Sequence, residues 1–194
     1  MPENDMLNTR VLKRSLDFFL ALIGLTLAFP IWLLIILLIW LENGRPIFYI
    51  QERVGKDSKL FKAIKFRTMN YRRGNSRLAS LLRKTALDEL PQLINIIKGD
   101  MSFVGPRPLI PKEMKMCNEL NLRLSVLPGL TGLAQILAAK DAPVLKKFNY
   151  DIFYIKNQNI ALDILLILKS VGISLNRKWD IINSGLKIKL KMKL

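Results

Sequence analysis

A run of 24 residues without a charged side chain, from Phe18 to Leu41, constrains this chain more than any other feature. As a continuous helix it would be about 36 Å long, which is enough to cross the hydrocarbon core of a bilayer. It is too long for the apolar core of a signal peptide, and no small-residue cleavage pattern follows it. The run therefore predicts a membrane helix near the N-terminus.

Two features of this run argue against a simple span. Pro30 lies in its middle, where the missing backbone donor favours a break in the helix. Basic residues on both flanks favour placing both ends on the cytoplasmic side, by the positive-inside tendency. A re-entrant helix–break–helix satisfies both observations, whereas a spanning helix and a buried soluble helix are the alternatives. The flanking residues are Arg10, Lys13 and Arg14 before the run, and Arg45, Arg53, Lys56, Lys59, Lys62 and Lys65 after it.

The rest of the chain is both basic and apolar. Lys and Arg number 31 against 15 Asp and Glu, a net charge of +16, and 51% of the residues are hydrophobic. Residues 1–17 carry equal numbers of acids and bases, so the whole excess lies in residues 42–194. This combination is typical of a body that docks on anionic membrane lipid or holds an anionic substrate at the membrane.

Two residue counts exclude several kinds of chemistry. The chain has no His, which excludes a Ser-His-Asp hydrolase and a His-ligated metal site. Cys117 is the only Cys, which excludes a disulfide framework and favours a small core residue. Catalysis would have to use carboxylates, Lys, Tyr, Ser or Thr.

Periodicity predicts a helix-rich α/β fold with two parts, a membrane segment over residues 1–42 and a body over residues 43–194. Two strands over residues 47–51 and 60–69 are expected to form a hairpin, and loops are expected over residues 71–76 and 127–132. Gly99 is expected to end the second helix of the body. Lys alternates with apolar residues from Lys187 to Leu194, which predicts a segment on lipid headgroups. Helices, some of them interfacial and amphipathic, are expected over residues 78–84, 87–98, 112–124, 144–156 and 160–175.

The most informative candidate site is an acidic pair, Asp88 and Glu89, at the start of an otherwise apolar helix. Acidic residues suit a helix N-terminus, so the residue types also fit simple capping. A carboxylate near Lys or Arg can instead attack a phosphorus centre, and a neighbouring carboxylate can hold Mg²⁺. The residues alone leave both interpretations open.

Two basic elements could bind the phosphates of a substrate. Pro106 and Pro108 restrict the backbone around Arg107, whose guanidinium then forms a preorganised fork. Strand alternation places Lys65 and Arg67 on one face. A solvated turn and a solvated strand face are the corresponding structural alternatives.

These motifs resemble those of the bacterial sugar transferases, and within them the small monotopic phosphoglycosyl transferases. The most specific pieces are the acidic pair and Gly-Asp-Met-Ser-Phe-Val-Gly-Pro-Arg-Pro at residues 99–108. The pieces occur in family order over about residues 10–175: Lys13 and Arg14, Pro30, and residues 51–55, 65–69, 87–93, 98–108, 128–132 and 148–157.

The resemblance implies an enzyme that transfers a phospho-sugar from a UDP-sugar to a polyprenol phosphate, commonly undecaprenyl phosphate, with release of UMP. Its expected location is the cytoplasmic face of the bacterial inner membrane, where it would begin a surface glycan or glycoprotein. Asp88 would be the covalent nucleophile, and Glu89 would assist in proton handling and, with Asp88, in holding Mg²⁺. Lys65, Arg67, Arg83 and Arg107 would steady phosphate charge, and Asp151 would be a polar active-site residue.

Several positions depart from the usual family pattern, and they bear on substrate identity more than on the reaction. Phe29 stands where relatives often have Ser; Leu127, Leu133 and residues 138–140 lie in the segment expected to meet nucleotide or sugar. A non-catalytic basic protein on anionic lipid is the alternative function. A nucleic-acid binder is disfavoured because the basic stretches lack interleaved aromatics. The sequence makes no prediction of the sugar or the oligomeric state.

Overall fold

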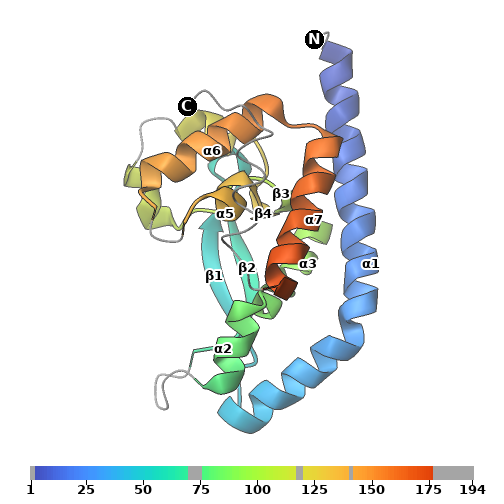
Figure 1. Ribbon diagram of the computed structural model, residues 1–194, viewed down its shortest axis with the longest axis vertical. Coiled ribbons are helices and arrows are strands. Elements are labelled where there is room, and N and C mark those ends of the chain that lie inside the picture. The colour runs from blue at the N-terminus through green and yellow to red at the C-terminus, as the bar shows by residue number, and fades with distance from the viewer. Residues whose placement is uncertain (1–2, 70–75, 117–119, 140–141, 177–194) are drawn as a thin grey trace.

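The computed structural model describes residues 3–69, 76–116, 120–139 and 142–176. It has the predicted helix-rich α/β fold, with a long N-terminal helix along one side of a smaller body (Figure 1). The elements are α1 (Glu3–Asn43), β1 (Phe48–Val54), the 3₁₀ turn η1 (Lys56–Ser58), β2 (Leu60–Phe66), α2 (Arg77–Lys84), η2 (Leu87–Glu89), α3 (Gln92–Lys98), β3 (Ser102–Val104), η3 (Pro111–Met116), α4 (Leu120–Leu124), β4 (Gly129–Thr131), α5 (Leu133–Leu137), α6 (Val144–Asn157) and α7 (Ile160–Asn176).

Helix α1 is 41 residues long and includes Pro30. Figure 1 shows that it changes direction partway along its length, and a Pro inside a helix produces such a bend by removing one hydrogen bond. The secondary structure continues through Pro30, so the predicted break takes the form of a bend. By length and composition, Arg10–Asn43 could cross a membrane.

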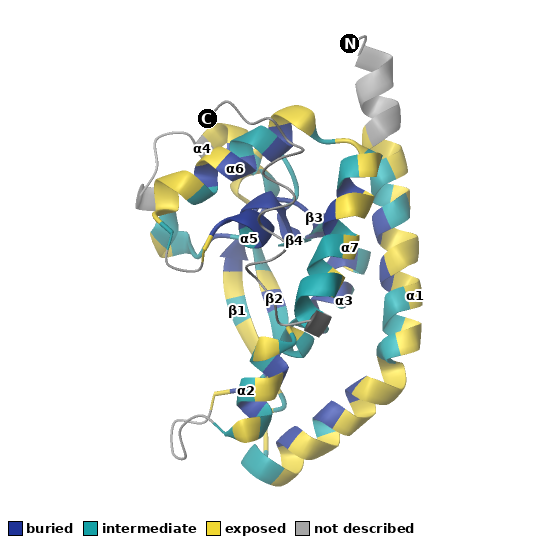
Figure 2. Cartoon of the chain, in the orientation of Figure 1, coloured by how far each residue is buried: buried dark blue, intermediate teal, exposed yellow. Residues whose placement is uncertain are grey.

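One face of α1 packs against the body, both before and after Pro30. Ala21 is fully buried against Leu93 and Ile96 of α3. Further along, Trp32 packs edge-on against Phe66 of β2, with their ring centroids 5.4 Å apart. The opposite face stays open, and most of its apolar side chains are exposed (Figure 2).

Strands β1 and β2 form the predicted antiparallel hairpin, with Gln51 opposite Ala63. Strands β3 and β4 form a second, parallel pair, which corrects the loop expected over residues 127–132. Each of these two strands has three residues, too few to show a periodic pattern. The close approach of the two backbones requires glycine at position 129, because a Cβ there would collide with the backbone of Gly105 and Thr131.

Apart from the contacts with α1, a hydrophobic core lies among α5, α6 and α7, where Leu133, Tyr150, Tyr154 and Leu166 are fully buried.

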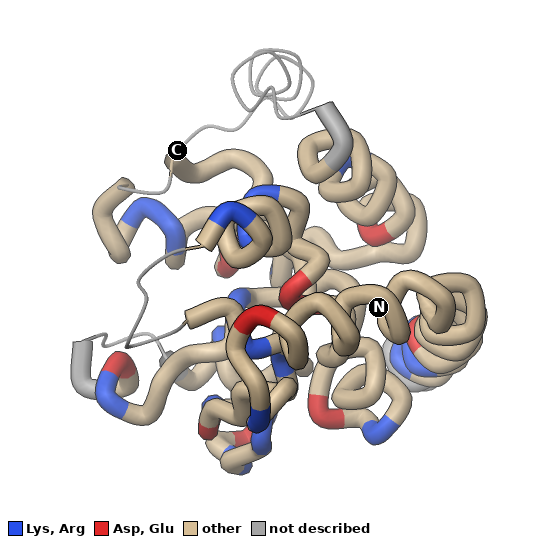
Figure 3. The backbone as a smooth tube through the Cα atoms, turned by 90° about the horizontal axis from the view of Figure 1, so that it is seen from below, with Lys and Arg blue, Asp and Glu red and all other residues tan. Residues whose placement is uncertain are grey.

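Helices α6 and α7 confirm two predicted helices, and α5 was not predicted. Residues 112–116 lie in a 3₁₀ segment, so the long helix expected over residues 112–124 is wrong there. Expectations for residues 71–75, Cys117 and residues 187–194 concern positions outside the described residues. Lys and Arg positions are distributed over several elements of the body (Figure 3).

Candidate active site

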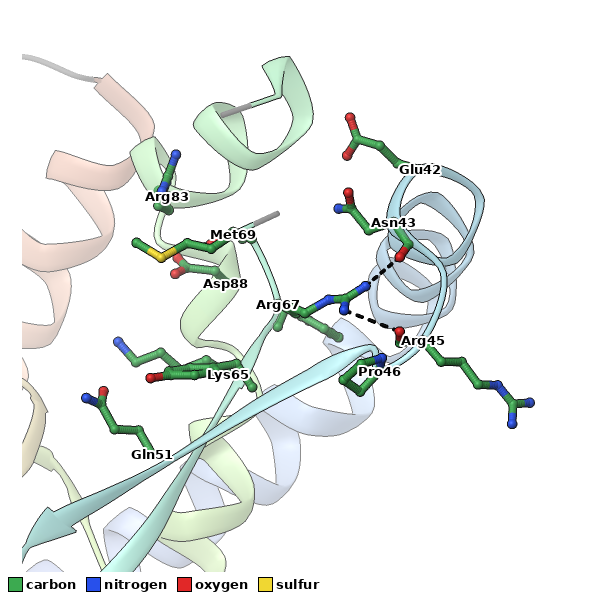
Figure 4. Close-up of a pocket in the computed structure, with 13 residues that line it drawn as sticks. Glu42, Asn43, Arg45, Pro46, Gln51, Lys65, Arg67, Met69, Arg83 and Asp88 are labelled. Carbon is green, nitrogen blue, oxygen red and sulfur yellow. Dashed lines mark hydrogen bonds between the residues drawn. The ribbon is translucent and has the colours of Figure 1, made fainter. Parts of the chain in front are cut away.

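A cavity of about 940 Å³ lies between the end of α1, the β1–β2 hairpin, α2 and η2 (Figure 4). Asp88 from η2 faces the same space as Lys65 from β2 and Arg83 from α2. Arg67 and Gln51 also line it. The tertiary structure therefore brings four predicted site residues to one cavity. They are Lys65, Arg67, Arg83 and Asp88.

A left-handed residue and a short turn separate the two helices that flank the acidic pair. Helix α2 begins at a cap in which the Ser76 hydroxyl accepts from Ala79 N–H at 3.0 Å. After α2 ends, Ala86 adopts a left-handed conformation with φ of 56°, and the turn η2 follows. Helix α3 then begins at Gln92, with Pro91 at its N-cap position.

This geometry corrects the helix expected from Leu87 onward. Asp88 and Glu89 lie in a separate 3₁₀ turn before α3, rather than in the first turn of an α-helix. The N-cap residue of α3 is Pro91, so the acidic pair does not fill that capping position. Gly99 ends α3 in the left-handed conformation, which confirms the predicted helix end.

The two acidic side chains have different surroundings. Lys65 Nζ forms an ion pair with Glu89 Oε1. Asp88 is half-buried, and burial raises its pKa to about 6, with a further increase from the negative charge of Glu89. The positive charges of Lys65 and Arg83 act in the opposite direction. Asp88 therefore changes charge close to neutral pH, whereas Glu89 has a cationic partner.

Arg67 lies at the cavity as predicted, but its guanidinium already has partners. It donates to the carbonyl oxygens of Asn43 at 2.6 Å, Gly44 at 3.0 Å and Arg45 at 3.3 Å. These oxygens belong to the last residue of α1 and to the turn that follows. The structure thus joins Arg67 to the end of the apolar helix.

Arg107 and Asp151 do not line the cavity that contains Asp88. Both line a second cavity of about 480 Å³, next to α4 and α6. Asp151 is 2% exposed and accepts from Arg123 Nε at 2.9 Å, and Arg123 Nη2 donates to Arg107 O at 2.7 Å. Burial raises the pKa of Asp151 to about 6, against the opposing effect of Arg123.

Two arginines that sequence reasoning did not assign organise this region. Arg53 is buried and donates to Gln51 Oε1 at 2.6 Å and Pro108 O at 3.1 Å, so it connects the two cavities. Its burial lowers its pKa. Arg53 follows Gln51 by two positions in a strand, which could have placed both on one face. Arg123 had no comparable local signal.

The residue types of the acidic pair suit Mg²⁺ bound together with a substrate diphosphate, and Asp88 is the member of the pair that lines the cavity. Among the described residues, no group of three or more acidic, His or Cys side chains could form a closed metal cage. Mg²⁺ in phosphoryl-transfer sites commonly takes one or two carboxylates and completes its shell with water and substrate phosphates. Asp88 and Glu89 supply that number of carboxylates, and a divalent cation would offset the repulsion between them.

Asp88, Lys65 and Arg83 thus line one cavity together with the end of a long apolar helix, which is the arrangement expected of an enzyme that acts on an anionic substrate at a membrane. The family model described as bacterial sugar transferase matches residues 8–177. The chain belongs to this family.

Three relatives illustrate the match. The exopolysaccharide production protein ExoY of Sinorhizobium fredii is 33% identical over 82% of this chain and 83% of its own length. The UDP-galactose-lipid carrier transferase of Erwinia amylovora is 33% identical, over 88% of this chain. The undecaprenyl-phosphate galactose phosphotransferase of Salmonella typhimurium is 31% identical over the same share. The chain spans 42% of the length of each of the last two proteins.

Proposed function

We propose that this protein transfers a phospho-sugar from a UDP-sugar to a polyprenol phosphate, giving a polyprenyl diphosphate sugar and UMP. The observation that carries the proposal is Asp88, half-buried between Lys65 and Arg83 in a large cavity that the end of an apolar helix helps to line. Undecaprenyl phosphate is the acceptor class named for the Salmonella relative. The product would begin a surface glycan.

In the first half-reaction, a carboxylate oxygen of Asp88 forms a bond to the phosphorus that carries the sugar. The bond from this phosphorus to the bridging oxygen of the diphosphate breaks, and UMP leaves with that oxygen and its electron pair. Lys65 and Arg83 stabilise the phosphate charge through preorganised positive groups. Glu89 keeps Lys65 oriented toward the site through their ion pair.

In the second half-reaction, an oxygen of the polyprenol phosphate forms a bond to the same phosphorus. The bond between this phosphorus and Asp88 breaks, which restores the carboxylate. Keeping the site at the membrane avoids extracting a long prenol into water, at about 0.8 kcal/mol per CH₂ group. Mg²⁺ held by Asp88 and Glu89 would neutralise diphosphate charge when bound.

The second cavity has a supporting part in this proposal. Arg107 would steady phosphate charge, as the family resemblance implies. Asp151 would act through Arg123, which donates to the backbone of Arg107.

The proposed topology is re-entrant, with the body on the cytoplasmic face of the inner membrane. Polar groups of one body contact α1 near both of its ends. Lys13 forms an ion pair with Asp163 at 2.6 Å, and Arg14 donates to Ile96 O at 2.6 Å. At the other end, Arg67 donates to Asn43 O. A single body can reach both ends most simply when they lie on the same side of the membrane.

Labelling tests this topology. Single cysteines at Leu12 and Leu41, in a Cys117→Ser background, should both react with an impermeant maleimide from the cytoplasmic side only. Both native side chains are more than half exposed, so the substitutions leave the core intact. Labelling of the two positions from opposite sides would establish a spanning helix instead.

The pH dependence of the first half-reaction should follow the ionisation of Asp88. Because only the carboxylate attacks, kcat/KM should rise through pH about 6 and then level off. Lys65→Gln removes a positive charge that lowers this pKa, so the inflection should move to higher pH. Initial UMP release from a UDP-sugar gives both profiles. Lys62→Gln, at an exposed position on the same strand, is the matched control, and an inflection that moves to lower pH in Lys65→Gln would contradict the assignment.

The central experiment uses the protein in vesicles with undecaprenyl phosphate and a panel of UDP-sugars. Release of UMP together with a lipid-linked sugar phosphate is the expected result. The non-catalytic alternative predicts salt-sensitive vesicle binding without UMP release from any donor.

A further inference from the structure

The end of α1 is held by an arginine from a different part of the chain. Arg67 lies 24 positions after Asn43, yet its Nη2 donates to Asn43 O at 2.6 Å and to Gly44 O at 3.0 Å. Its Nη1 donates to Arg45 O at 3.3 Å. Figure 4 shows the guanidinium directed at the end of the helix rather than at Asp88.

This arrangement matches the needs of a helix C-terminus. The last carbonyl groups of a helix have no intrahelical partner and carry a partial negative charge. Gly44, with φ of 63°, closes the helix by donating to Trp40 O at 2.9 Å. Arg67 then donates to the carbonyl oxygens of residues 43–45, because its planar guanidinium can reach several acceptors at once.

The backbone of Arg67 extends the pairing of β2, the strand that carries Lys65. The backbone N–H of Arg67 donates to Ile47 O at 2.8 Å, which continues the hairpin beyond β2. Two positions earlier in the chain, Lys65 pairs with Glu89 of the acidic pair. A short path of contacts therefore leads from the end of α1 to the catalytic carboxylates.

A second contact joins α1 to another wall of the cavity. The Ser76 hydroxyl donates to Glu42 Oε2 at 3.0 Å while it also caps α2. Helix α2 carries Arg83, which lines the same cavity as Asp88. The end of α1 therefore contacts both the segment after β2, the strand that carries Lys65, and the start of α2, the helix that carries Arg83.

We infer that Arg67 is a positioning residue for the lipid acceptor, which fixes the end of the membrane helix against the catalytic strand so that the acceptor phosphate can reach Asp88. This inference rests on the proposed function. It assigns Arg67 to the backbone of α1 instead of the substrate phosphates. Misplacing the helix end should affect a bilayer-bound acceptor more than a water-soluble donor.

The test separates the two half-reactions in vesicle-reconstituted full-length protein. Formation of the covalent adduct is measured from a radiolabelled UDP-sugar, and decay of the adduct is measured with undecaprenyl phosphate. In Arg67→Gln, we expect the second step to slow about tenfold more than the first, the equivalent of about one net charge-assisted hydrogen bond. Arg67→Lys should behave similarly, because it keeps the charge but loses the fork. Lys62→Gln is the control for loss of one positive charge on β2.

Amide hydrogen exchange over residues 40–47 provides a readout that does not depend on chemistry. Faster exchange in both Arg67 variants is expected, because the helix end loses its partner. Equal slowing of both half-reactions, or full recovery in Arg67→Lys, would overturn the inference in favour of phosphate binding. If the wild type forms no adduct but residues 40–47 still exchange faster in the Arg67 variants, the proposed function is refuted. The role of Arg67 in holding the end of α1 is then retained, and its role in placing the acceptor is not. If Arg67→Gln does not fold, Arg67→Lys supplies the same comparisons.

Discussion

Asp88→Asn is expected to lower phospho-sugar transfer by about a thousandfold or more, because the amide cannot form the acyl phosphate. The substitution keeps the size of the side chain. It also resembles the protonated carboxyl, which Asp88 carries below its pKa of about 6. The fold and membrane association should therefore be preserved. Transfer assays in vesicles measure the loss of activity, and a thermal unfolding curve measures the stability of the fold.

Two comparisons make this result interpretable. Glu52→Gln removes a carboxylate from an exposed position on β1 and should leave transfer near the wild-type rate. Glu89→Gln should lower transfer without abolishing the adduct, since Glu89 pairs with Lys65 and, in the proposed scheme, would help to hold Mg²⁺. Full turnover in Asp88→Asn would show that the covalent scheme is wrong.

Asp151→Ala is expected to destabilise the fold by about 3–5 kcal/mol, the usual cost of removing one partner from a buried ion pair. Asp151 is 2% exposed and Arg123 is 8% exposed, so the substitution leaves a mostly buried guanidinium without its carboxylate partner. Arg123 is further held by Phe148, whose ring centroid lies 4.5 Å from the guanidinium carbon. Denaturant unfolding of the wild type and the variant measures the difference.

A double-mutant cycle separates the pair from its surroundings. Arg123→Met and Asp151→Leu should each be strongly destabilising, whereas the double variant should lose less than the sum of the two. Glu52→Ala, an exposed acid, should change the free energy of unfolding by less than about 0.5 kcal/mol. Additive losses in the cycle would mean that the ion pair contributes little.

The position of Asp151 changes how its part in the activity is understood. The family resemblance implies a polar active-site residue, while the geometry supports an indirect effect through Arg123 and the backbone of Arg107. If so, Asp151→Asn should alter the KM for the donor more than the rate of decay of the adduct. The same assay on Arg123→Lys should show the same pattern.

Local sequence patterns were sufficient for much of the fold. The uncharged run predicted α1, alternation predicted the β1–β2 hairpin, and helical periodicity predicted α6 and α7. Each of these signals depends on neighbours only a few positions apart. The acidic pair was recognisable for the same reason, because Asp88 and Glu89 are adjacent.

The sequence by itself determined the apolar helix, the hairpin, the acidic pair and the basic body. Only the tertiary structure decided which bases surround Asp88, that Arg67 holds the end of α1, and that Asp151 pairs with Arg123. The parallel pairing of β3 with β4 was decided at the same level. The physical reason is that most of these contacts join residues from separate elements of the fold, such as Arg67 with Asn43 and Arg123 with Asp151, and a local pattern cannot specify which of many similar charges will meet.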